Sequence, residues 1–338
     1  MEIRSITLHI PLGFSVNYRR IVERLEDAVK ELKINVFSKR IVVDFNKVSK
    51  EDILSLEEIR EEAGVDYIAT HLNTLENFSL IAEALNKTER TFISTRLENE
   101  MFREYAKSIK IVFKKASWYG CARYGISIGK TPVTPYFPVT RGGEYGFSLS
   151  ILYASDLIKN ELETIPEIFY KAYSLGCEIS RKTRIPFIGV DYSLSPWMDD
   201  SVARLIEVLN KASFGEPGTL QTIYKLNKLI EKHSIGLKPI GFNEVMLPVA
   251  EDNILKDAVR KGRITLHHLL SYISVCVAGL DMVPINYRIS VEKIARILQD
   301  LSVLADLKKR TVGVRIVLVE GEGEVDLGFF EKTPVLKI

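Results

Sequence analysis

The first hundred residues alternate between short apolar segments and amphipathic ones, and this alternation restricts the chain to a small set of folds. Residues 3–10 (IRSITLHI) alternate in the manner of a strand, and residues 17–32 place Ile21, Leu25 and Ala28 on one helical face. Further strand-like segments follow at 40–45, 67–72 and 91–97, with helix-like segments at 50–62, 75–86 and 98–108. This β-α order predicts a layered or barrel α/β architecture.

The chain is long and apolar enough to bury a large core. Its 338 residues are 46% hydrophobic, which fits one large α/β unit or two smaller domains. No repeat, low-complexity tract or Ser/Gly linker marks a boundary, so we expect a single domain over 1–338. The formal net charge of +2 gives no field for a nucleic acid or an anionic membrane, and we expect neither as a partner.

The cysteines and the N-terminus bear on the cellular compartment. Cys121, Cys177 and Cys276 are far apart and odd in number, and they form no Cys-x-x-Cys motif. An acid at position 2 argues against a signal peptide, and no apolar run reaches the roughly 18–20 residues of a bilayer span. We therefore expect a cytoplasmic protein without a structural zinc. Scarce glutamine beside abundant lysine and glutamate is typical of hot-living hosts.

The segment 117–146 lacks a sustained period and is rich in glycine, proline and aromatic residues. It is too long for a simple connector, so we expect it to carry function or to wrap the core. Tyr136 and Arg141 would line a mouth, and Arg141 with the two glycines that follow would hold a carboxylate or phosphate. The alternative is a structural loop whose aromatic residues pack on the core. At the other end of the chain, residues 311–319 and 325–330 are predicted to pair as a hairpin.

Five stretches, taken in order, resemble one family. They are IRSIT (3–7), TPYFPVT (134–140), GVDYSLSP (189–196), GEPGT (215–219) with MLPVAED (246–252), and VCVAGLDM (275–282) with KKRTVGVRI (308–316). Their order and spacing resemble the DUF711 family, also called UPF0210, over essentially the whole chain. The resemblance implies a ten-stranded α/β barrel like that of pyruvate formate-lyase, and a homodimer. With the hairpin predicted above, the expected fold is this barrel followed by a C-terminal β-hairpin.

The radical chemistry of that barrel group is not expected to transfer. Glycyl-radical enzymes carry their glycine in an Arg-Val-x-Gly-Tyr setting near the C-terminus. The nearest string here, residues 310–314 (RTVGV), lacks the tyrosine and lies on a predicted strand. Likeness of fold does not carry function with it.

Cys276 and Asp281 lie in the apolar run VCVAGLDMVP. Cys276 between two valines is typical of a buried core cysteine, and a site thiol is the alternative that the barrel resemblance favours. Asp281 is costly to bury without a partner, so we expect it to orient a polar ligand, cap a turn, or pair with Arg315 or Arg288.

Two turns carry polar groups at predicted element ends. Asp191 and Ser193 follow an apolar strand, where α/β proteins bind ligands, although the same residues serve equally well in a turn. Gly218 and Thr219 precede a helix, where free N–H groups bind anions or where the chain merely turns.

Glu251 and Asp252 follow a strand-like segment, and either is the preferred general base if the protein is catalytic. Both carboxylates would also interact favourably with the dipole of a helix that starts nearby. A metal held by Asp191, Glu251, Asp252 and Asp281 is an alternative without support from spacing, so we predict no metal.

The sequence thus predicts an enzyme that acts on a small polar or anionic metabolite inside the barrel. Cys276 would be the nucleophile or redox thiol, Asp281 and Asp191 would orient the substrate, and Glu251 or Asp252 would move protons. Gly218 and Thr219 with Arg315 would hold an anion. The alternative is a ligand-binding or regulatory protein that has the same groups without chemistry. The sequence names no cofactor.

Overall fold

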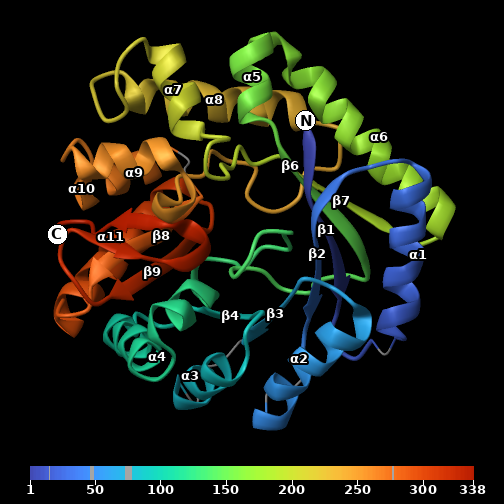
Figure 1. The fold of residues 1–338 in the computed structure, drawn as a ribbon, viewed down its shortest axis with the longest axis horizontal. Helices are drawn as coiled ribbons and strands as arrows, with labels where there is room; N and C mark the ends of the chain where they lie inside the picture. Colours follow the sequence, from blue (N-terminus) through green and yellow to red (C-terminus); the bar gives the residue numbers. More distant parts are fainter. Residues whose placement is uncertain (15, 46–48, 73–77, 276–277) are drawn as a thin grey trace.

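A computed structural model describes residues 1–14, 16–45, 49–72, 78–275 and 278–338. Its centre is a nine-stranded sheet with the order β7-β6-β1-β2-β3-β4-β5-β9-β8 (Figure 1). The strands are β1 (Glu2–Ile10), β2 (Val36–Val43), β3 (Tyr67–Leu72), β4 (Thr91–Arg96), β5 (Tyr124–Ile128), β6 (Gly146–Leu152), β7 (Phe187–Asp191), β8 (Gly279–Asn286) and β9 (Val312–Val319). A separate two-stranded sheet joins β10 (Glu324–Asp326) to β11 (Lys332–Pro334).

Helices connect the strands. They are α1 (Tyr18–Glu31), α2 (Lys50–Ala63), α3 (Phe78–Lys87), α4 (Phe102–Arg123), α5 (Ala154–Asn160), α6 (Ile165–Thr183), α7 (Val202–Asn210), α8 (Thr219–Ser234), α9 (Asn253–Arg260), α10 (Leu266–Ile273) and α11 (Val291–Lys308). Short 3-10 turns cover Leu162–Thr164, Val249–Glu251 and Gly328–Phe330. Among the described helices, none combines the length and the apolar composition needed to cross a bilayer.

The predicted alternation is confirmed in the N-terminal half. Strands β1 to β5 run parallel, as helical crossovers require. Helix α1 begins where the Asn17 side chain accepts from the backbone N–H of Arg20, and it buries Ile21, Val22, Leu25 and Ala28. On both flanks the direction reverses, since β6 is antiparallel to β1 and β9 is antiparallel to β5.

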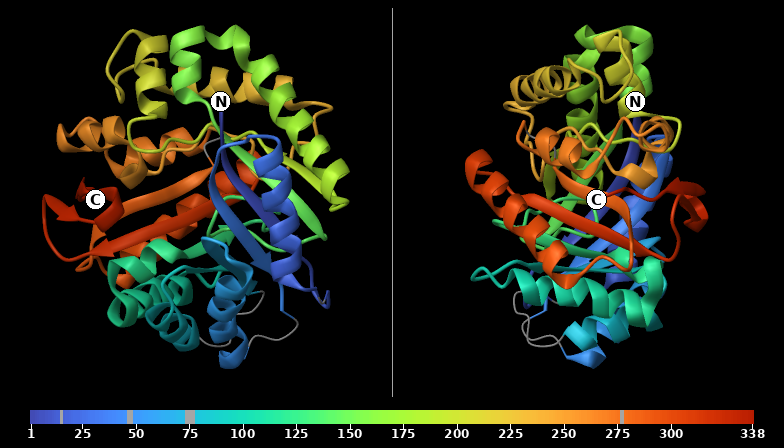
Figure 2. Two further views of the ribbon diagram at one scale, coloured as in Figure 1. Left: turned by 45° about the vertical axis from the view of Figure 1, so that its right-hand side comes forward. Right: turned by 90° about the vertical axis from the view of Figure 1, so that its left-hand side faces the viewer.

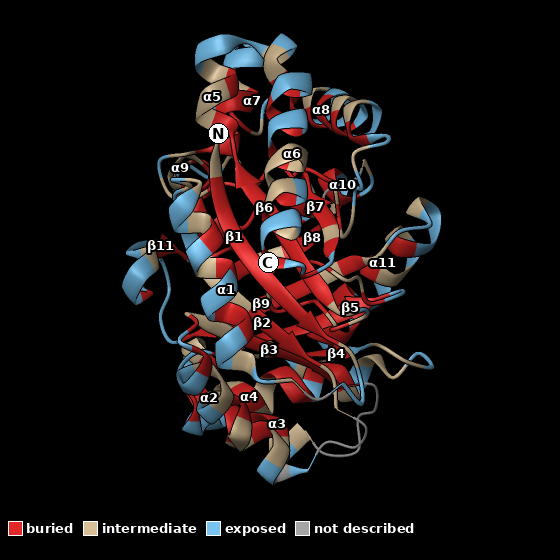
Figure 3. Ribbon diagram, turned by 90° about the vertical axis from the view of Figure 1, so that its right-hand side faces the viewer, coloured by how far each residue is buried: buried red, intermediate tan, exposed pale blue. Residues whose placement is uncertain are grey.

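The two faces of the sheet differ in chemistry. Leu8, Ile41 and Ile68 pair in one row and belong to a hydrophobic core shared with the helices. The neighbouring row contains Thr7, Arg40 and Tyr67 and lies on the opposite face, because successive residues of a strand alternate between faces. Figure 3 shows most of the large sheet buried and the helices exposed along their outer sides.

We call this second side of the sheet the polar face. Its side chains hydrogen-bond across strands: Ser5 Oγ lies 2.6 Å from Ser150 Oγ, and His9 Nε2 lies 2.7 Å from Ser148 Oγ. Buried polar groups need such partners, and the neighbouring strands provide them.

The irregular segment packs against the polar face. Part of the predicted stretch 117–146 belongs to α4 and β5, and the remainder, 129–145, lies in the middle of the molecule (Figure 1). Thr131 Oγ1 contacts His71 Nε2 at 3.0 Å and Ser127 Oγ at 2.8 Å. The segment therefore fills the space in front of the polar face, and it does not run over the surface as an ordinary connector does.

An extended segment covers the two edge strands. Val190 of β7 bridges to Pro239, and Leu194 bridges to Val245. The Val245 carbonyl in turn accepts from the N–H of Ala278, next to β8, at 3.2 Å. Residues 239–245 thus link the end of β7 to the residue that precedes β8, at the two edges of the sheet. The sheet itself has nine strands, where the family resemblance implied ten in a barrel.

The predicted C-terminal hairpin pairs different strands from those expected. Residues 311–319 were expected to pair with 325–330, but β9 lies between β5 and β8 in the large sheet. Nearly all of β9 is buried, which requires cover on both faces and suits a central strand. The hairpin is instead formed by β10 and β11 and projects from the body of the molecule (Figure 2).

Candidate functional site

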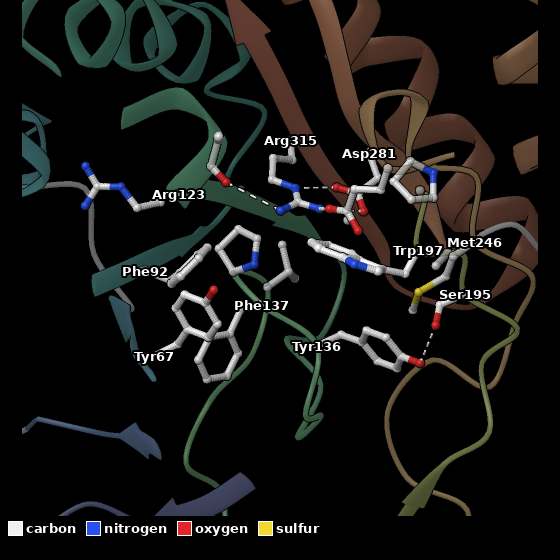
Figure 4. A pocket seen from close by; sticks show the side chains of 18 of the residues that line it. Tyr67, Phe92, Arg123, Tyr136, Phe137, Ser195, Trp197, Met246, Asp281 and Arg315 are labelled. Carbon is white, nitrogen blue, oxygen red and sulfur yellow. Dashed lines mark hydrogen bonds and ion pairs between the residues drawn. The ribbon is translucent and has the colours of Figure 1, made fainter. Parts of the chain in front are cut away.

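A cavity of about 180 Å³ opens beside the polar face of the sheet. Side chains of β1 to β4 line it on one side, β8 and β9 line it on another, and the central segment 129–145 contributes a third part. Its apolar floor is a small cluster separate from the main core, made of Tyr136, Val139, Phe242, Met246 and Ala278. Figure 4 shows aromatic rings on one side of the cavity and a charged pair on the other.

The charged wall is a chain of alternating ions. Arg315 Nε donates to Asp281 Oδ1 at 2.6 Å, and Arg315 Nη2 donates to Asp281 Oδ2 at 3.0 Å. The same Nη2 reaches Glu251 Oε1 at 2.8 Å. The other oxygen of Glu251 accepts from Arg4 Nη2 at 3.0 Å. Two guanidinium groups and two carboxylates, brought from β1, β8, β9 and a 3-10 turn, thus form one continuous network.

The two carboxylates differ in accessibility and in proton affinity. The Glu251 side chain is 7% exposed and the Asp281 side chain is 30% exposed. Burial alone would raise the pKa of Glu251, but the guanidinium groups of Arg315 and Arg4 lower it below its ordinary value. For Asp281 burial prevails over Arg315, and its pKa is raised. Asp281 is therefore the more basic group and the one that solutes reach.

Arg4 is held through both of its terminal nitrogens, and its buried Nε has no hydrogen-bond partner within the described residues. Its Nη1 donates to the Pro196 carbonyl at 2.6 Å and to Ser195 Oγ at 3.1 Å. Its guanidinium carbon lies 5.6 Å from the Tyr136 ring centroid and 5.5 Å from that of Trp197. Tyr136 Oη lies 2.9 Å from Ser195 Oγ, and burial raises the pKa of Tyr136 to about 12, so its hydroxyl stays protonated.

Arg40 belongs to the same cavity but to no ion pair among the described residues. Its Nε donates to Ser38 Oγ at 2.9 Å, and its Nη1 donates to the Pro135 carbonyl at 2.9 Å. The rings of Phe137 and Tyr67 lie 5.2 and 5.7 Å from its guanidinium carbon. Burial first, and then the nearby charge of Arg4, lower the pKa of Arg40 to about 10.

Four of the residues predicted from the sequence meet at this cavity: Tyr136, Glu251, Asp281 and Arg315. Of the partners proposed for Asp281, Arg315 is the one that the structure provides. Six others lie elsewhere and are engaged in local structure: Arg141, Asp191, Ser193, Gly218, Thr219 and Asp252. Cys276 lies outside the described residues, and its role as a thiol stays a prediction.

Asp191 is buried and accepts hydrogen bonds from three separate parts of the chain. Its carboxylate accepts from Thr134 Oγ1 at 2.6 Å, from Ser193 Oγ at 2.5 Å and from the backbone N–H groups of Phe242 and Asn243 at 2.9 and 3.1 Å. The Ser193 hydroxyl also accepts from the N–H of Glu244. These bonds tie the central segment and residues 242–244 to the end of β7. Both side chains therefore satisfy buried backbone groups, and no ligand is needed to explain them.

Asp252 serves two helix starts. It is the N-cap residue of α9, where it accepts from the N–H groups of Ile254 and Leu255. It also accepts from Ser201 Oγ at 2.6 Å and from the N–H of Ala203 at 3.0 Å, at the start of α7. Burial raises its pKa, and the hydrogen bonds act against that shift. Its neighbour Glu251 faces the cavity and Asp252 does not, because adjacent residues diverge.

The two loops that were predicted to bind an anion, at Gly218–Thr219 and after Arg141, make hydrogen bonds within the protein instead. Gly218 adopts φ +98° before α8, and the Thr219 hydroxyl accepts from the N–H of Gly215 and donates to the Glu216 carbonyl. Arg141 donates its Nε to the Thr131 carbonyl. The two glycine N–H groups after Arg141 do bind a carboxylate, but it is that of Asp44, at 2.8 and 3.2 Å.

Sequence reasoning missed Arg4, Arg40 and Trp197. A signal exists for Arg4, because it lies in a predicted strand between Ile3 and Ser5, and a cation buried there needs a partner. Arg40 follows Lys39 and precedes Ile41, so the signal there is weaker. Trp197 follows the GVDYSLSP stretch, and nothing local distinguishes it. No group of three or more potential metal ligands lies within the described ranges.

The amino-acid sequence matches a known protein family. The family model described as Uncharacterised ACR (DUF711) matches residues 2–330. A UPF0210 protein of Methanocorpusculum labreanum is 33% identical over 190 residues, which cover 52% of this chain and 42% of that protein. The match to a UPF0210 protein of Bifidobacterium longum subsp. infantis is of the same kind, with 32% identity and 39% of the relative's length covered.

Longer matches extend over nearly the whole chain at lower identity. The UPF0210 protein MK1214 of Methanopyrus kandleri is 24% identical over 374 residues, which cover 94% of this chain and 83% of that protein. The chain covers about two fifths of the length of the Methanocorpusculum and Bifidobacterium relatives. The extent of the family match shows that the chain belongs to the DUF711 family.

Proposed function

We propose that this protein is an enzyme that acts on a small polar or anionic metabolite in the cavity, with Asp281 as its proton-transferring group. The observation that carries the proposal is the unequal pair of carboxylates on one wall. Glu251 lies between two guanidinium groups that favour its charged form, and Asp281 is more exposed and has a raised pKa. A carboxylate whose pKa is raised in a cavity holds its proton more readily, which suits a general acid–base group.

Each neighbouring group has a role in this proposal. Arg315 orients Asp281 through two hydrogen bonds and stabilises its charged form after proton release. Glu251 holds Arg315 and Arg4 in place. The Tyr136 and Ser195 hydroxyls lie 2.9 Å apart and one donates to the other, which leaves the proton of the second to donate to a bound oxygen. The aromatic side of the cavity would exclude water from the reacting groups.

The experiment begins with native mass spectrometry of the gently purified protein, beside its denatured mass. A defined extra mass identifies a retained metabolite. That metabolite, or a pool of small organic acids if none is retained, is then incubated with the protein in D₂O and followed by ¹H NMR. We expect conversion or hydrogen exchange by the wild type and its loss in Asp281→Asn.

Asp300→Asn is the matched control, because Asp300 is exposed on α11 and does not line the cavity. It should keep wild-type turnover. Turnover that persists unchanged in a folded Asp281→Asn protein would show that Asp281 does not move the proton.

A second candidate function has its own observation. All four oxygens of Glu251 and Asp281 already accept from a guanidinium, which is typical of a rigid binding wall. On this view the protein binds a metabolite without converting it, as a carrier or regulator. A metabolite that stabilises the fold and is recovered unchanged after long incubation favours this candidate.

The resemblance to the family motivates three further proposals. We infer a cytoplasmic homodimer from a hot-living host, in line with the family and with the composition. We also infer that the sheet, linked from β7 to β8 through residues 239–245, is a variant of the ten-stranded barrel. Light scattering of the purified protein tests the dimer.

A further inference from the structure

The charges in the cavity do not balance, and the excess is positive: Arg4, Arg40, Arg90, Arg123 and Arg315 line it against two carboxylates, Glu251 and Asp281. Of these arginines, Arg90 is exposed to solvent. Arg4 and Arg315 pair with Glu251 and Asp281, so these four groups are neutral together. Arg123 also reaches the cavity, but its nitrogens donate to the backbone carbonyls of Leu85, Thr88, Thr91 and Tyr119. Arg40 adds one positive charge, and no carboxylate of the described residues pairs with it.

Arg40 also has hydrogen-bonding capacity to spare, at an edge wide enough for a carboxylate, whereas among the described residues Arg4 lacks a partner at its Nε alone. Ser38 and the Pro135 carbonyl fix its Nε and one proton of Nη1. Its Nη2 has no acceptor within the described part of the chain, although the side chain lines the cavity. The edge formed by Nη1 and Nη2 is one of the two guanidinium edges that can bind a carboxylate in parallel hydrogen bonds.

The surroundings of Arg40 are aromatic. Tyr67 and Phe137 lie against its guanidinium, and Phe92 packs on both, with ring centroids 5.7 Å from Tyr67 and 5.6 Å from Phe137. Figure 4 shows these three rings gathered on one side of the cavity. A ligand bound at Arg40 would therefore place its body against apolar rings, which disfavours a heavily hydroxylated or phosphorylated compound.

We propose that Arg40 binds the carboxylate of a small monocarboxylic acid whose apolar part packs against Tyr67, Phe92 and Phe137. The unpaired guanidinium of Arg40 fits one carboxylate, and the aromatic rings around it disfavour a second charge on the ligand. The volume of about 180 Å³ limits the acid to a small one. The lowered pKa of Arg40, near 10, is the response expected of a buried cation that lacks its anion.

This inference rests on the proposed function, in that the cavity is taken to be the ligand site, and it deepens that function by naming the class of ligand. The two are separable in an experiment. Binding of the acid depends on Arg40, whereas its conversion depends on Asp281. A folded Asp281→Asn protein should therefore retain binding.

The test uses Trp197, which lines the cavity, as the reporter. Trp118 is the other tryptophan of the chain, so Trp118→Phe leaves a single emitter. The probes are butanoate, benzoate, neutral benzamide, malonate and inorganic phosphate, added to this variant and to the same variant with Arg40→Gln. We expect butanoate or benzoate to bind, and Arg40→Gln to weaken that binding about 10- to 100-fold, the effect of losing hydrogen bonds to a charged group.

Two controls make the result specific. Arg90→Gln removes an exposed arginine that also lines the cavity, and it should change the dissociation constant by less than about twofold. Urea unfolding of each variant verifies that Arg40→Gln is folded. Equal binding of benzoate to the wild type and to Arg40→Gln would overturn the proposal, as would stronger binding of malonate, phosphate or benzamide than of either monocarboxylate.

Discussion

The guanidinium of Arg315 binds both oxygens of Asp281, at 2.6 and 3.0 Å, and it shares one nitrogen with Glu251. Asp281 lies on β8 and Arg315 lies on β9. These strands are adjacent and parallel, so the backbone fixes the separation of the two residues. The planar fork of an arginine matches a carboxylate in this geometry, and a lysine would not. Arg315 and Asp281 together hold the charged wall of the cavity in place.

Loss of Arg315 should destabilise the fold strongly. In Arg315→Met two neighbouring carboxylates lose their shared cation, and breaking a buried ion pair from one side costs about 3–5 kcal/mol. Asp281→Asn should cost less, about 1–2 kcal/mol, because Arg315 keeps Glu251 and the Asp281 side chain is partly exposed. Urea unfolding at pH 7 measures both. A smaller loss for Arg315→Met than for Asp281→Asn would contradict this account of the wall.

Asp191 should matter for stability and not for ligand binding. Asp191→Asn places an amide where the carboxylate accepts from two hydroxyls and from backbone N–H groups, so some of those donors lose their acceptor. We expect a loss of about 2–4 kcal/mol in the free energy of unfolding. Asp199→Asn, at an exposed position that accepts one hydrogen bond from Asn253, is the control and should change little.

Gly241 and Gly236 provide a matched pair for the backbone next to Asp191. Both have positive φ, +77° and +81°. A Cβ at Gly241 would lie 2.1 Å from Asp191 Oδ2 and 2.7 Å from Thr134 Oγ1, whereas a Cβ at Gly236 meets no atom within 4 Å. Gly236→Ala should therefore cost only the left-handed conformation, about 1 kcal/mol. Gly241→Ala should add the steric term, for a total of about 3 kcal/mol or more. Equal melting temperatures for the two variants would refute the close packing.

The sequence predicted what depends on local pattern. The spacing of apolar residues in the first hundred positions predicted β1 to β4 and the helices between them. A helix that buries one face has apolar residues repeating about every 3.6 positions, and this repeat is visible in the sequence. The expense of burying a carboxylate in the run around Asp281 correctly predicted a partner, and Arg315 was one of two named. Each inference needs only a short window and a general energetic rule.

The rest depends on contacts between distant parts of the chain. Arg4 and Glu251 meet across 247 positions, and nothing near either residue records the other. Asp191 and Asp252 looked like site residues because capping and clamping use the same oxygen acceptors as ligand binding. The hairpin was misplaced because an apolar strand followed by a turn does not reveal whether the next partner is local or central.

Two buried histidines should make the fold sensitive to mild acid. His9 bonds to Ser148, and His71 bonds to Ser94 and to Thr131 of the central segment. Burial lowers the pKa of each to about 4, from 6.5 in the unfolded chain. The unfolded state therefore binds protons first as the pH falls. The stabilisation is complete above pH 6.5 and is lost between about 6.5 and 4, at about 3 kcal/mol for each histidine.

Urea unfolding at intervals from pH 7 to 5 measures this slope above the range in which most carboxylates titrate. We expect the free energy of unfolding to fall steadily across the interval. His9→Gln and His71→Gln should each flatten the slope, whatever their stability at pH 7, since each removes one proton-binding site from the unfolded state. His267→Gln, at an exposed position on α10, should leave the slope as it is. A wild-type slope that stays flat from pH 7 to 5 would mean that His9 and His71 accept protons in the folded protein, and the polar face around them would then have to admit charge and water.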